Sequence, residues 1–173
     1  KLSLIKDPST VPGLNELRLL GKNGVPDYVF YFNGVHKGSE STYIVRVQDP
    51  EGVDPSDNKL KKRIEAKVED SKGCTAQEVF YVEYLDIDIP RFFTPNGDGE
   101  NDTWTPRNIQ QYPNILTQIY DRYGRLLKEL SRGETWDGTY NGKALPTGDY
   151  WYIITLGEED DSREFKGHFT LFR

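Results

Sequence analysis

Apolar and polar residues alternate with a period close to two along most of the first half of the chain. In "KRIEAKVED", Ile64, Ala66 and Val68 share one side of an extended chain, and charged residues take the positions between them. Such alternation is typical of an antiparallel strand with one buried face. The segments "DYVFYF", "STYIVRV" and "QEVFYVEYL" predict further strands, separated by turn signals such as Asn33-Gly34. Residues 1–85 are therefore predicted to form a small β-sandwich.

The second half is predicted to be a series of hairpins. The segments "NILTQIY" and "RLLKEL" flank "DRYG", in which Asp121 can start a turn and Gly124 can adopt positive φ. Further on, Asn141-Gly142 within "TYNGKAL" is the strongest short hairpin signal of the chain.

The last two strands are expected in "LPTGDYWYIITL" and "EFKGHFTLFR". In the first of them, alternation places Tyr150, Tyr152 and Ile154 on one face, with Trp151 and Ile153 on the other. The acidic segment "GEEDDSR" between the two strands is expected to be a solvated turn.

A domain boundary is predicted near residues 85 and 86. The segment "LDIDIPRFF" contains Pro90, which cannot donate to a sheet ladder, and it lacks the Gly/Ser tract of a flexible linker. No amphipathic helix pattern is found. The predicted fold is all-β, with two tandem Ig-like antiparallel β-sandwich domains, residues 1–85 and 86–173.

Composition narrows the classes of function. The chain has 173 residues, 13% of them aromatic, and a formal net charge of −6. That charge argues against nucleic-acid binding, which needs clustered Lys and Arg, and it suits a protein that stays soluble outside a cell. No transmembrane stretch or signal peptide is found, and the chain opens without Met, which predicts a piece of a longer protein, monomeric as a fragment.

The residues that commonly carry catalysis do not form a recognisable motif. His36 and His168 fall in different predicted domains, and no nucleophile motif is present. The single cysteine, Cys74, excludes an internal disulfide. It is expected to pack as a small buried hydrophobe, with pairing to a segment outside this chain as the alternative. We therefore predict that the protein is not an enzyme.

The segment "FFTPNGDGENDTW" allows two interpretations. Asn96, Asp98, Glu100 and Asp102 place oxygen donors at alternate positions, as in short calcium loops, although the EF-hand pattern fails because Asn101 stands where Gly is required. Alternatively, the same residues build consecutive turns, with Asn and Asp bonding their own backbone and the glycines supplying positive φ. The sequence predicts no required cofactor, with Ca²⁺ as an optional ligand.

Four blocks in the second half carry a resemblance to a known family. These are "FFTPNGDGENDTW", "QIYDRYGRLL", "WDGTYNGKALPTGDYWYIITL" and the ending "KGHFTLFR". Together they resemble the gliding-motility-associated C-terminal domain of the Bacteroidota, the type B C-terminal domain of type IX secretion system cargo. The first half is similar to the PKD-like or Ig-like repeats that precede this domain in large surface adhesins.

The resemblance implies a folded export signal. Family members pass through the periplasm and across the outer membrane to the cell surface or the exterior. The implied partners are proteins: the type IX outer-membrane translocon, a shuttle barrel, or a PorP/SprF-like outer-membrane protein. A folded signal can be recognised by addition of a strand to a free sheet edge.

Within the last strand, residues 164–173, an apolar and a polar face are expected to have different roles. Phe165, Phe169 and Leu171 are assigned to the core, and Lys166, His168 and Arg173 are the candidate recognition residues. The tryptophans are expected to be core anchors: Trp104, Trp136 and Trp151.

Two principal hypotheses for the function therefore remain. In the first, the chain is the end of a secreted gliding or adhesion protein, and its terminal domain is an export and surface-attachment signal. In the second, the chain is a calcium-stabilised adhesive module that itself binds carbohydrate or protein. A passive spacer is a third, weaker option.

Overall fold

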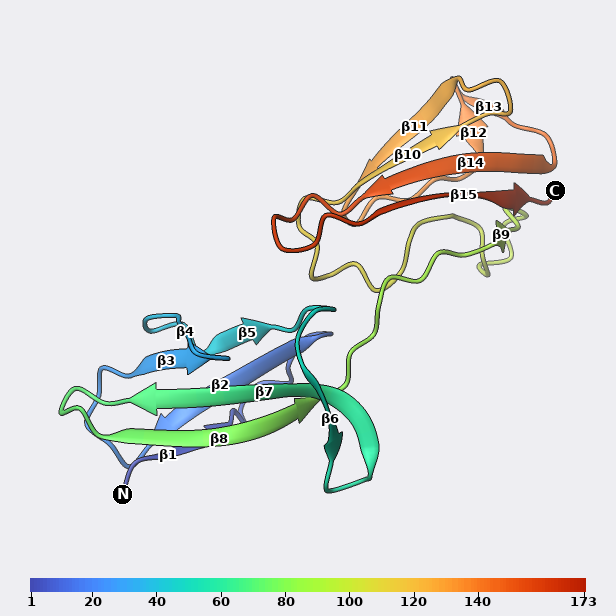
Figure 1. Cartoon of the computed structure of the whole chain (residues 1–173). Helices are drawn as coiled ribbons and strands as arrows, with labels where there is room; N and C mark the ends of the chain where they lie inside the picture. The colour runs from blue at the N-terminus through green and yellow to red at the C-terminus, as the bar shows by residue number, and fades with distance from the viewer. The chain divides into compact units, whose positions relative to one another are not determined.

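The computed structural model describes all residues 1–173, which form strands and turns but no helices. The chain divides into two compact units, Lys1–Leu85 and Asp86–Arg173 (Figure 1). The first unit has one hydrophobic cluster of its own and the second has two. The all-β class predicted from the alternation is confirmed. With no helices in the fold, none provides a long apolar stretch of the kind that crosses a membrane.

The first unit consists of two antiparallel sheets. One has the strand order β1-β2-β5, and the other has the order β4-β3-β7-β6 with β8 paired to the opposite side of β7. The strands are β1 (Ser3–Lys6), β2 (Glu16–Lys22), β3 (Val29–Phe32), β4 (Val35–His36), β5 (Thr42–Ile44), β6 (Glu51–Asp54), β7 (Lys59–Glu69) and β8 (Thr75–Val82).

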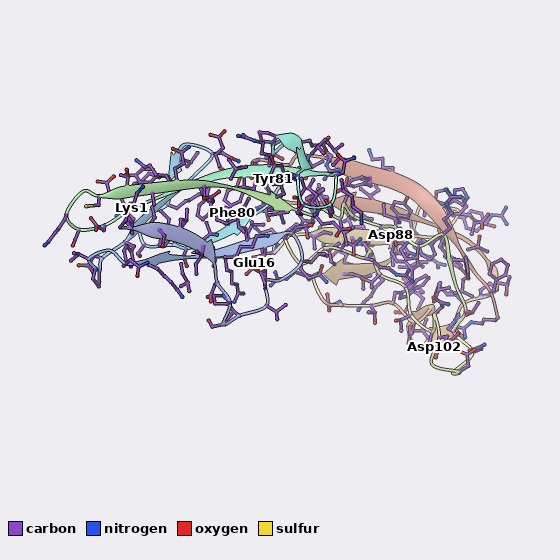
Figure 2. The ribbon with its side chains drawn as sticks, turned by 90° about the horizontal axis from the view of Figure 1, so that it is seen from below. Lys1, Glu16, Phe80, Tyr81, Asp88 and Asp102 are labelled. Atoms are coloured by element: carbon purple, nitrogen blue, oxygen red, sulfur yellow. The ribbon has the colours of Figure 1, made fainter.

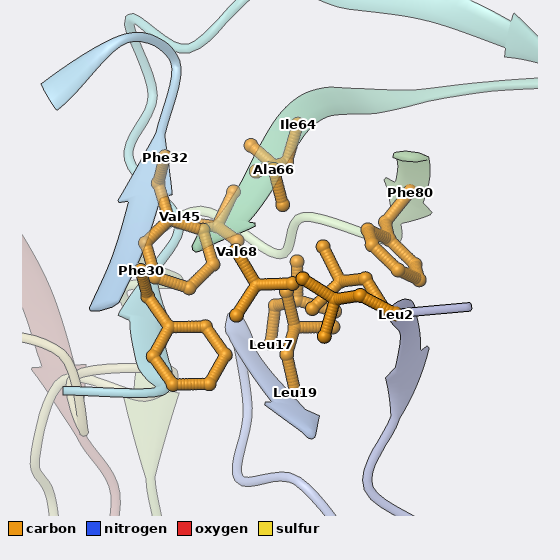
Figure 3. Close-up of a cluster of buried hydrophobic side chains, with 11 residues drawn as sticks. Leu2, Leu17, Leu19, Phe30, Phe32, Val45, Ile64, Ala66, Val68 and Phe80 are labelled. Carbon is orange, nitrogen blue, oxygen red and sulfur yellow. The ribbon is translucent and has the colours of Figure 1, made fainter. Parts of the chain in front are cut away.

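Alternation along β7 builds the core of the first unit. Ile64 and Val68 are completely buried and Ala66 is 1% exposed, as their spacing predicts. They pack against leucines of β1 and β2 and phenylalanines of β3 and β8 (Figure 3). The cluster contains side chains of both sheets, so the unit is a sandwich held by burial of apolar surface between its layers.

The prediction that Cys74 is buried is wrong. The cysteine is exposed and lies at the end of the turn between β7 and β8, directly after Gly73, whose φ is +79°. The Asp70 carboxylate accepts hydrogen bonds from the backbone N–H groups of Lys72 at 3.0 Å and Cys74 at 2.9 Å. This turn places the thiol outside the core, at the end of a hairpin.

The second unit is built on one five-stranded sheet with the order β11-β10-β14-β15-β9 and a separate two-stranded sheet, β12-β13. Strand β9 is short and runs parallel to the end of β15, and the other pairings are antiparallel. The strands are β9 (Phe92–Phe93), β10 (Leu116–Tyr120), β11 (Leu126–Ser131), β12 (Thr139–Tyr140), β13 (Lys143–Ala144), β14 (Gly148–Thr155) and β15 (Glu164–Leu171).

Aromatic rings form the core of the second unit. Trp104 and Phe169 are completely buried and stack with ring centroids 4.0 Å apart, and Trp136 is 2% exposed. The indole N–H of Trp104 donates to the carbonyl of Pro90 at 2.9 Å, and that of Trp136 to the carbonyl of Thr139 at 2.9 Å. Each buried indole thus has the polar partner that it needs. The prediction for these two tryptophans is confirmed.

The prediction that the whole segment "GEEDDSR" is a solvated turn is wrong at Asp161, which is 4% exposed. Burial alone would raise the pKa of Asp161, but hydrogen bonds from Arg163 and Tyr112 outweigh this effect and lower it. The Tyr112 hydroxyl donates to the carboxylate at 2.9 Å, and Arg163 donates to it at 2.7 Å. Arg163 also donates two bonds to Asp86, so this loop is fastened to the first residue of the unit.

Candidate recognition surface

The outer face of the five-stranded sheet carries cross-strand rows of side chains. Tyr120, Trp151 and His168 lie opposite one another on β10, β14 and β15. Neighbouring positions of the same strands, Ile119 and Phe169, are completely buried on the inner face. Because successive side chains of a strand point to opposite faces, the row with Trp151 lies on the outer face.

The next row on the outer face consists of Gln118, Ile153 and Lys166. The Gln118 amide donates to the carboxylate of Glu129 on β11 at 2.9 Å. Ile153 and Lys166 lie beside the Trp151 row and extend the surface toward the start of β15.

Trp151 is 40% exposed, so its prediction as a core anchor is wrong. Alternation along β14 is the physical reason, because Tyr150 and Ile154 face inward and are 6% and 0% exposed. The indole instead lies on the outer face, 6.3 Å from the ring of His168 between centroids.

Two hollows lie beside Trp151. The first, of about 520 Å³, is lined by Tyr120, Ile153, Lys166 and the turn after β10. The second, of about 370 Å³, is lined by Tyr123 together with the turn that precedes β14. Arg122 and Trp151 line both hollows and therefore lie between them.

The carboxylates around these hollows have partners within the chain. Asp121 accepts hydrogen bonds from the backbone N–H groups of Arg125 at 3.0 Å and Tyr123 at 2.9 Å, and its pKa is lowered mainly by the Arg125 N–H. Glu164 pairs with Lys166 at 2.7 Å. Asp149 accepts from the Thr170 hydroxyl at 2.6 Å. These three carboxylates are thus engaged by groups of the same unit.

Arg122 has no charged partner within the chain. Its guanidinium lies 5.8 Å from the centre of the Tyr123 ring and makes no ion pair. It is therefore a cation available to a bound group at the boundary between the two hollows. Arg122 and Tyr120 were not predicted as recognition residues. The alternation that sets Trp151 apart from Tyr150 is the sequence signal that locates this face.

The three recognition residues predicted from the last strand occupy different places. Lys166 and His168 are exposed on the outer face. Arg173 instead donates to the carbonyl oxygens of Leu145 at 2.9 Å and Gly138 at 3.2 Å, among others. Its side chain thus fastens the end of the chain to the loops before and after the β12-β13 hairpin.

One edge of β15 is open over most of its length. The strand pairs with β14 from Glu164 to Leu171, but its pairing with β9 covers only Thr170 and Leu171. The edge from Glu164 to Phe169 has no strand partner. The last strand thus has a free edge of the kind that strand addition requires, and Lys166 and His168 belong to this stretch.

The loop after β9 has the geometry of consecutive turns. The Asp102 carboxylate accepts hydrogen bonds from the backbone N–H groups of Gly97 at 2.6 Å and Gly99 at 2.8 Å. Both glycines have positive φ, of 81° and 89°. The bond from Gly97, followed by that from Gly99, lowers the pKa of Asp102. Figure 2 marks Asp102 on this loop.

Two of the other three predicted calcium donors, Asn96 and Asp98, also accept bonds from the backbone of the loop, whereas Glu100 takes part only through its backbone. The side-chain oxygen of Asn96 accepts from the N–H of Asp98 at 3.0 Å, and that of Asp98 accepts from the N–H of Glu100 at 2.8 Å. No group of three or more His, Cys, Asp or Glu side chains in the chain is arranged to hold a metal ion, and no cofactor is indicated. The donor atoms support the interpretation as turns. The calcium site stays an untested prediction.

The two histidines lie in different units. His36, on β4, contacts the ring of Tyr31 edge-on at 5.1 Å between centroids, whereas His168 lies beside Trp151 on the outer face of the second unit. Each histidine has an aromatic neighbour. Neither unit contains a site to which both histidines contribute.

Comparison with known families and proteins gives one match to a family model. The CHU_C Type IX secretion signal domain matches residues 87–171. The comparison with curated proteins found no match.

Two solved structures show low similarity. Dimeric latent PorU from Porphyromonas gingivalis is 16% identical with a TM-score of 0.35, over 98% of this chain and 20% of that one. SGBP-B of the Bacteroides ovatus mixed-linkage glucan utilization locus, solved with a mixed-linkage heptasaccharide, is 13% identical with a TM-score of 0.25, over 91% of this chain and 40% of that one. The chain thus spans less than half of either protein, and the scores are too low to support a structural argument. Residues 87–171 of the chain are thus recognised as a CHU_C Type IX secretion signal domain.

Proposed function

We propose that the chain is the C-terminal part of a secreted gliding or adhesion protein. In this proposal, residues 86–173 are a folded export and surface-attachment signal recognised by the type IX secretion system. The observation that carries the proposal is the family match over residues 87–171, a range that falls inside the compact unit Asp86–Arg173. The unit has an aromatic core of its own, which suits a signal that is recognised in its folded state.

Recognition is then a contact between proteins. The proposed partners are the outer-membrane translocon, a shuttle barrel or a PorP/SprF-like outer-membrane protein, met after passage through the periplasm. The open edge of β15 offers backbone groups to an added strand, and Lys166 and His168 offer side chains beside it. The first unit, residues 1–85, is proposed to be an Ig-like or PKD-like repeat that carries no catalytic function.

Export of a passenger protein tests this function. A fluorescent protein is fused in front of residues 1–173, behind a general secretory signal, and is expressed in a gliding bacterium with and without a working type IX translocon. The matched control carries residues 1–85 alone. We expect fluorescence at the cell surface or in the medium only with the whole chain and the intact translocon.

The opposite result would favour another function. If the whole chain is folded but stays in the periplasm of both strains, the signal hypothesis is wrong. The calcium-stabilised adhesive module would then be the hypothesis to pursue, by measuring ligand binding with and without Ca²⁺.

A further inference from the structure

We infer that the outer face of the second unit is a docking site for an extended protein segment that carries both apolar and acidic side chains. This docking patch consists of Tyr120, Arg122, Trp151, Ile153 and Lys166. The inference rests on the proposed function, because the segment is assigned to an outer-membrane protein of the secretion machinery.

The shape of the surface indicates an extended occupant. Trp151 and Arg122 lie between two hollows of about 520 and 370 Å³. A chain that crosses between them can place successive side chains in each hollow. The first hollow offers Tyr120 and Ile153 as apolar contacts, whereas Arg122 lies at the boundary, within reach of an anionic side chain.

The position of Trp151 favours tight binding. The residue lies within β14, which pairs with β10 on one side and with β15 on the other. Its backbone is therefore fixed before a partner arrives, so little conformational freedom is lost on binding. Trp, Tyr and Arg are the residues most enriched among the energetically dominant positions of protein interfaces. Trp151, Tyr120 and Arg122 supply all three types on one face.

The neighbouring side chains favour a protein over a sugar. Leu126, on β11 next to Tyr120, is 40% exposed, and Ile153 adds a second aliphatic side chain on the outer face. A mixed aliphatic and aromatic surface matches the apolar side chains of a protein segment.

Charge defines the chemistry of the partner. The chain is acidic, with a net charge of −6, yet the carboxylates near the docking patch are engaged by groups of the same unit, whereas Arg122 makes no ion pair. An acidic side chain is complementary to this cation, and a carboxylate can accept two parallel bonds from its guanidinium. The docking patch also continues through Lys166 to the open edge of β15.

The test uses the whole-chain passenger fusion with single substitutions. Trp151→Ala removes the ring between the hollows, and Arg122→Glu reverses the free charge. Lys143→Glu is the matched control, because Lys143 is exposed on β13 and lines neither hollow. Tryptophan fluorescence and circular dichroism during thermal unfolding show whether each variant is folded.

We expect wild type and Lys143→Glu to be exported equally. Arg122→Glu should lower exported passenger about tenfold with no change in the unfolding midpoint, and Trp151→Ala should lower it at least as much. Arg122→Lys, which keeps the charge, should retain more export than Arg122→Glu. If Trp151→Ala is found to unfold, the test rests on Arg122→Glu alone. The Arg122 side chain makes no ion pair in the chain, so its replacement removes no such contact from the fold.

Two outcomes would overturn the inference. If wild type is exported and folded Arg122→Glu is exported equally well, the docking patch is not read by the machinery, although the proposed function stands. The wild-type and variant proteins are also passed over an acidic polysaccharide column. If the folded variants are exported as well as wild type but are no longer retained on a column that retains wild type, the surface binds sugar and not protein. Failure of wild type itself to be exported would instead count against the proposed function.

Discussion

Asp102 shows how a single side chain organises the loop that begins the second unit. One carboxylate accepts the backbone N–H groups of both Gly97 and Gly99, two residues whose φ values only glycine adopts easily. The loop is therefore held by a charge that must stay ionised. Its stability should depend on pH through this group.

We predict that Asp102→Asn lowers the stability of the second unit at neutral pH and makes it less sensitive to acid. The folded-state pKa of Asp102 is lowered from 3.8, so its contribution is present above that value and is lost as pH falls through the lowered pKa. The measurement is the urea midpoint from tryptophan fluorescence between pH 7 and pH 2. All three tryptophans belong to the second unit, so the signal reports that unit alone.

The exposed residue Glu159 supplies the control. Glu159→Gln removes one negative charge from the same unit without removing a backbone contact. If Asp102→Asn and Glu159→Gln give the same dependence of the urea midpoint on pH, the special role given to Asp102 is wrong.

Single residues mark the limit of what the sequence could predict. Alternation placed Ile64 and Val68 in the core correctly, because period two follows from strand geometry itself. It could not show that Cys74 ends a hairpin turn, or that Asp161 is buried. The burial of Asp161 depends on Tyr112, which is 49 residues away in the sequence, and no local pattern predicts such a partner.

At the scale of elements, β15 contributes residues both to the core and to the candidate recognition surface. Its inward residues, Phe169 and Leu171, are completely buried, whereas Lys166 and His168 point outward. The sequence predicted these faces correctly for these four residues, whereas Phe165, also assigned to the core, is only partly buried. It could not predict that β9 would pair in parallel with only the end of β15, because a two-residue strand carries no periodic signal.

Gly167 on β15 provides a test of packing within the sheet. It lies opposite Tyr152 of β14, and a Cβ atom at residue 167 would lie only 2.5 Å from the Tyr152 hydroxyl oxygen. We predict that Gly167→Ala destabilises the second unit by about 1–3 kcal/mol, the usual cost of overpacking. Urea unfolding followed by tryptophan fluorescence measures the change.

The double variant Gly167→Ala with Tyr152→Leu should recover part of the lost stability, because the smaller side chain vacates the space that the new methyl group needs. The loss caused by Gly167→Ala should therefore be smaller in the Tyr152→Leu background than in the wild type. Equal losses in the two backgrounds would show that contact with Tyr152 is not the cause.

At the scale of the molecule, the two units have separate hydrophobic clusters. Ile64 belongs to the cluster of residues 1–85, whereas Trp104 and Phe169 belong to one in residues 86–173. A cavity in one cluster removes contacts from that cluster alone. This predicts unequal effects of one substitution on the two halves of the chain.

We predict that Ile64→Ala destabilises the first unit by about 2–5 kcal/mol. Amide hydrogen exchange should speed up across the strands of residues 1–85 and stay unchanged in β10, β14 and β15. Tryptophan fluorescence should report the wild-type midpoint, since no tryptophan lies in the first unit. Faster exchange in both units to the same extent would contradict this prediction.

The five-stranded sheet also sets a minimum bore for any channel that transports the signal unit without unfolding it. Five strands spaced about 4.8 Å apart extend about 19 Å across their backbones, before side chains are added. An α-helix with its side chains needs only about 10–12 Å. A machine that accepts the folded unit therefore requires an aperture of roughly twice the diameter of a helix, together with a seal that closes it between passengers.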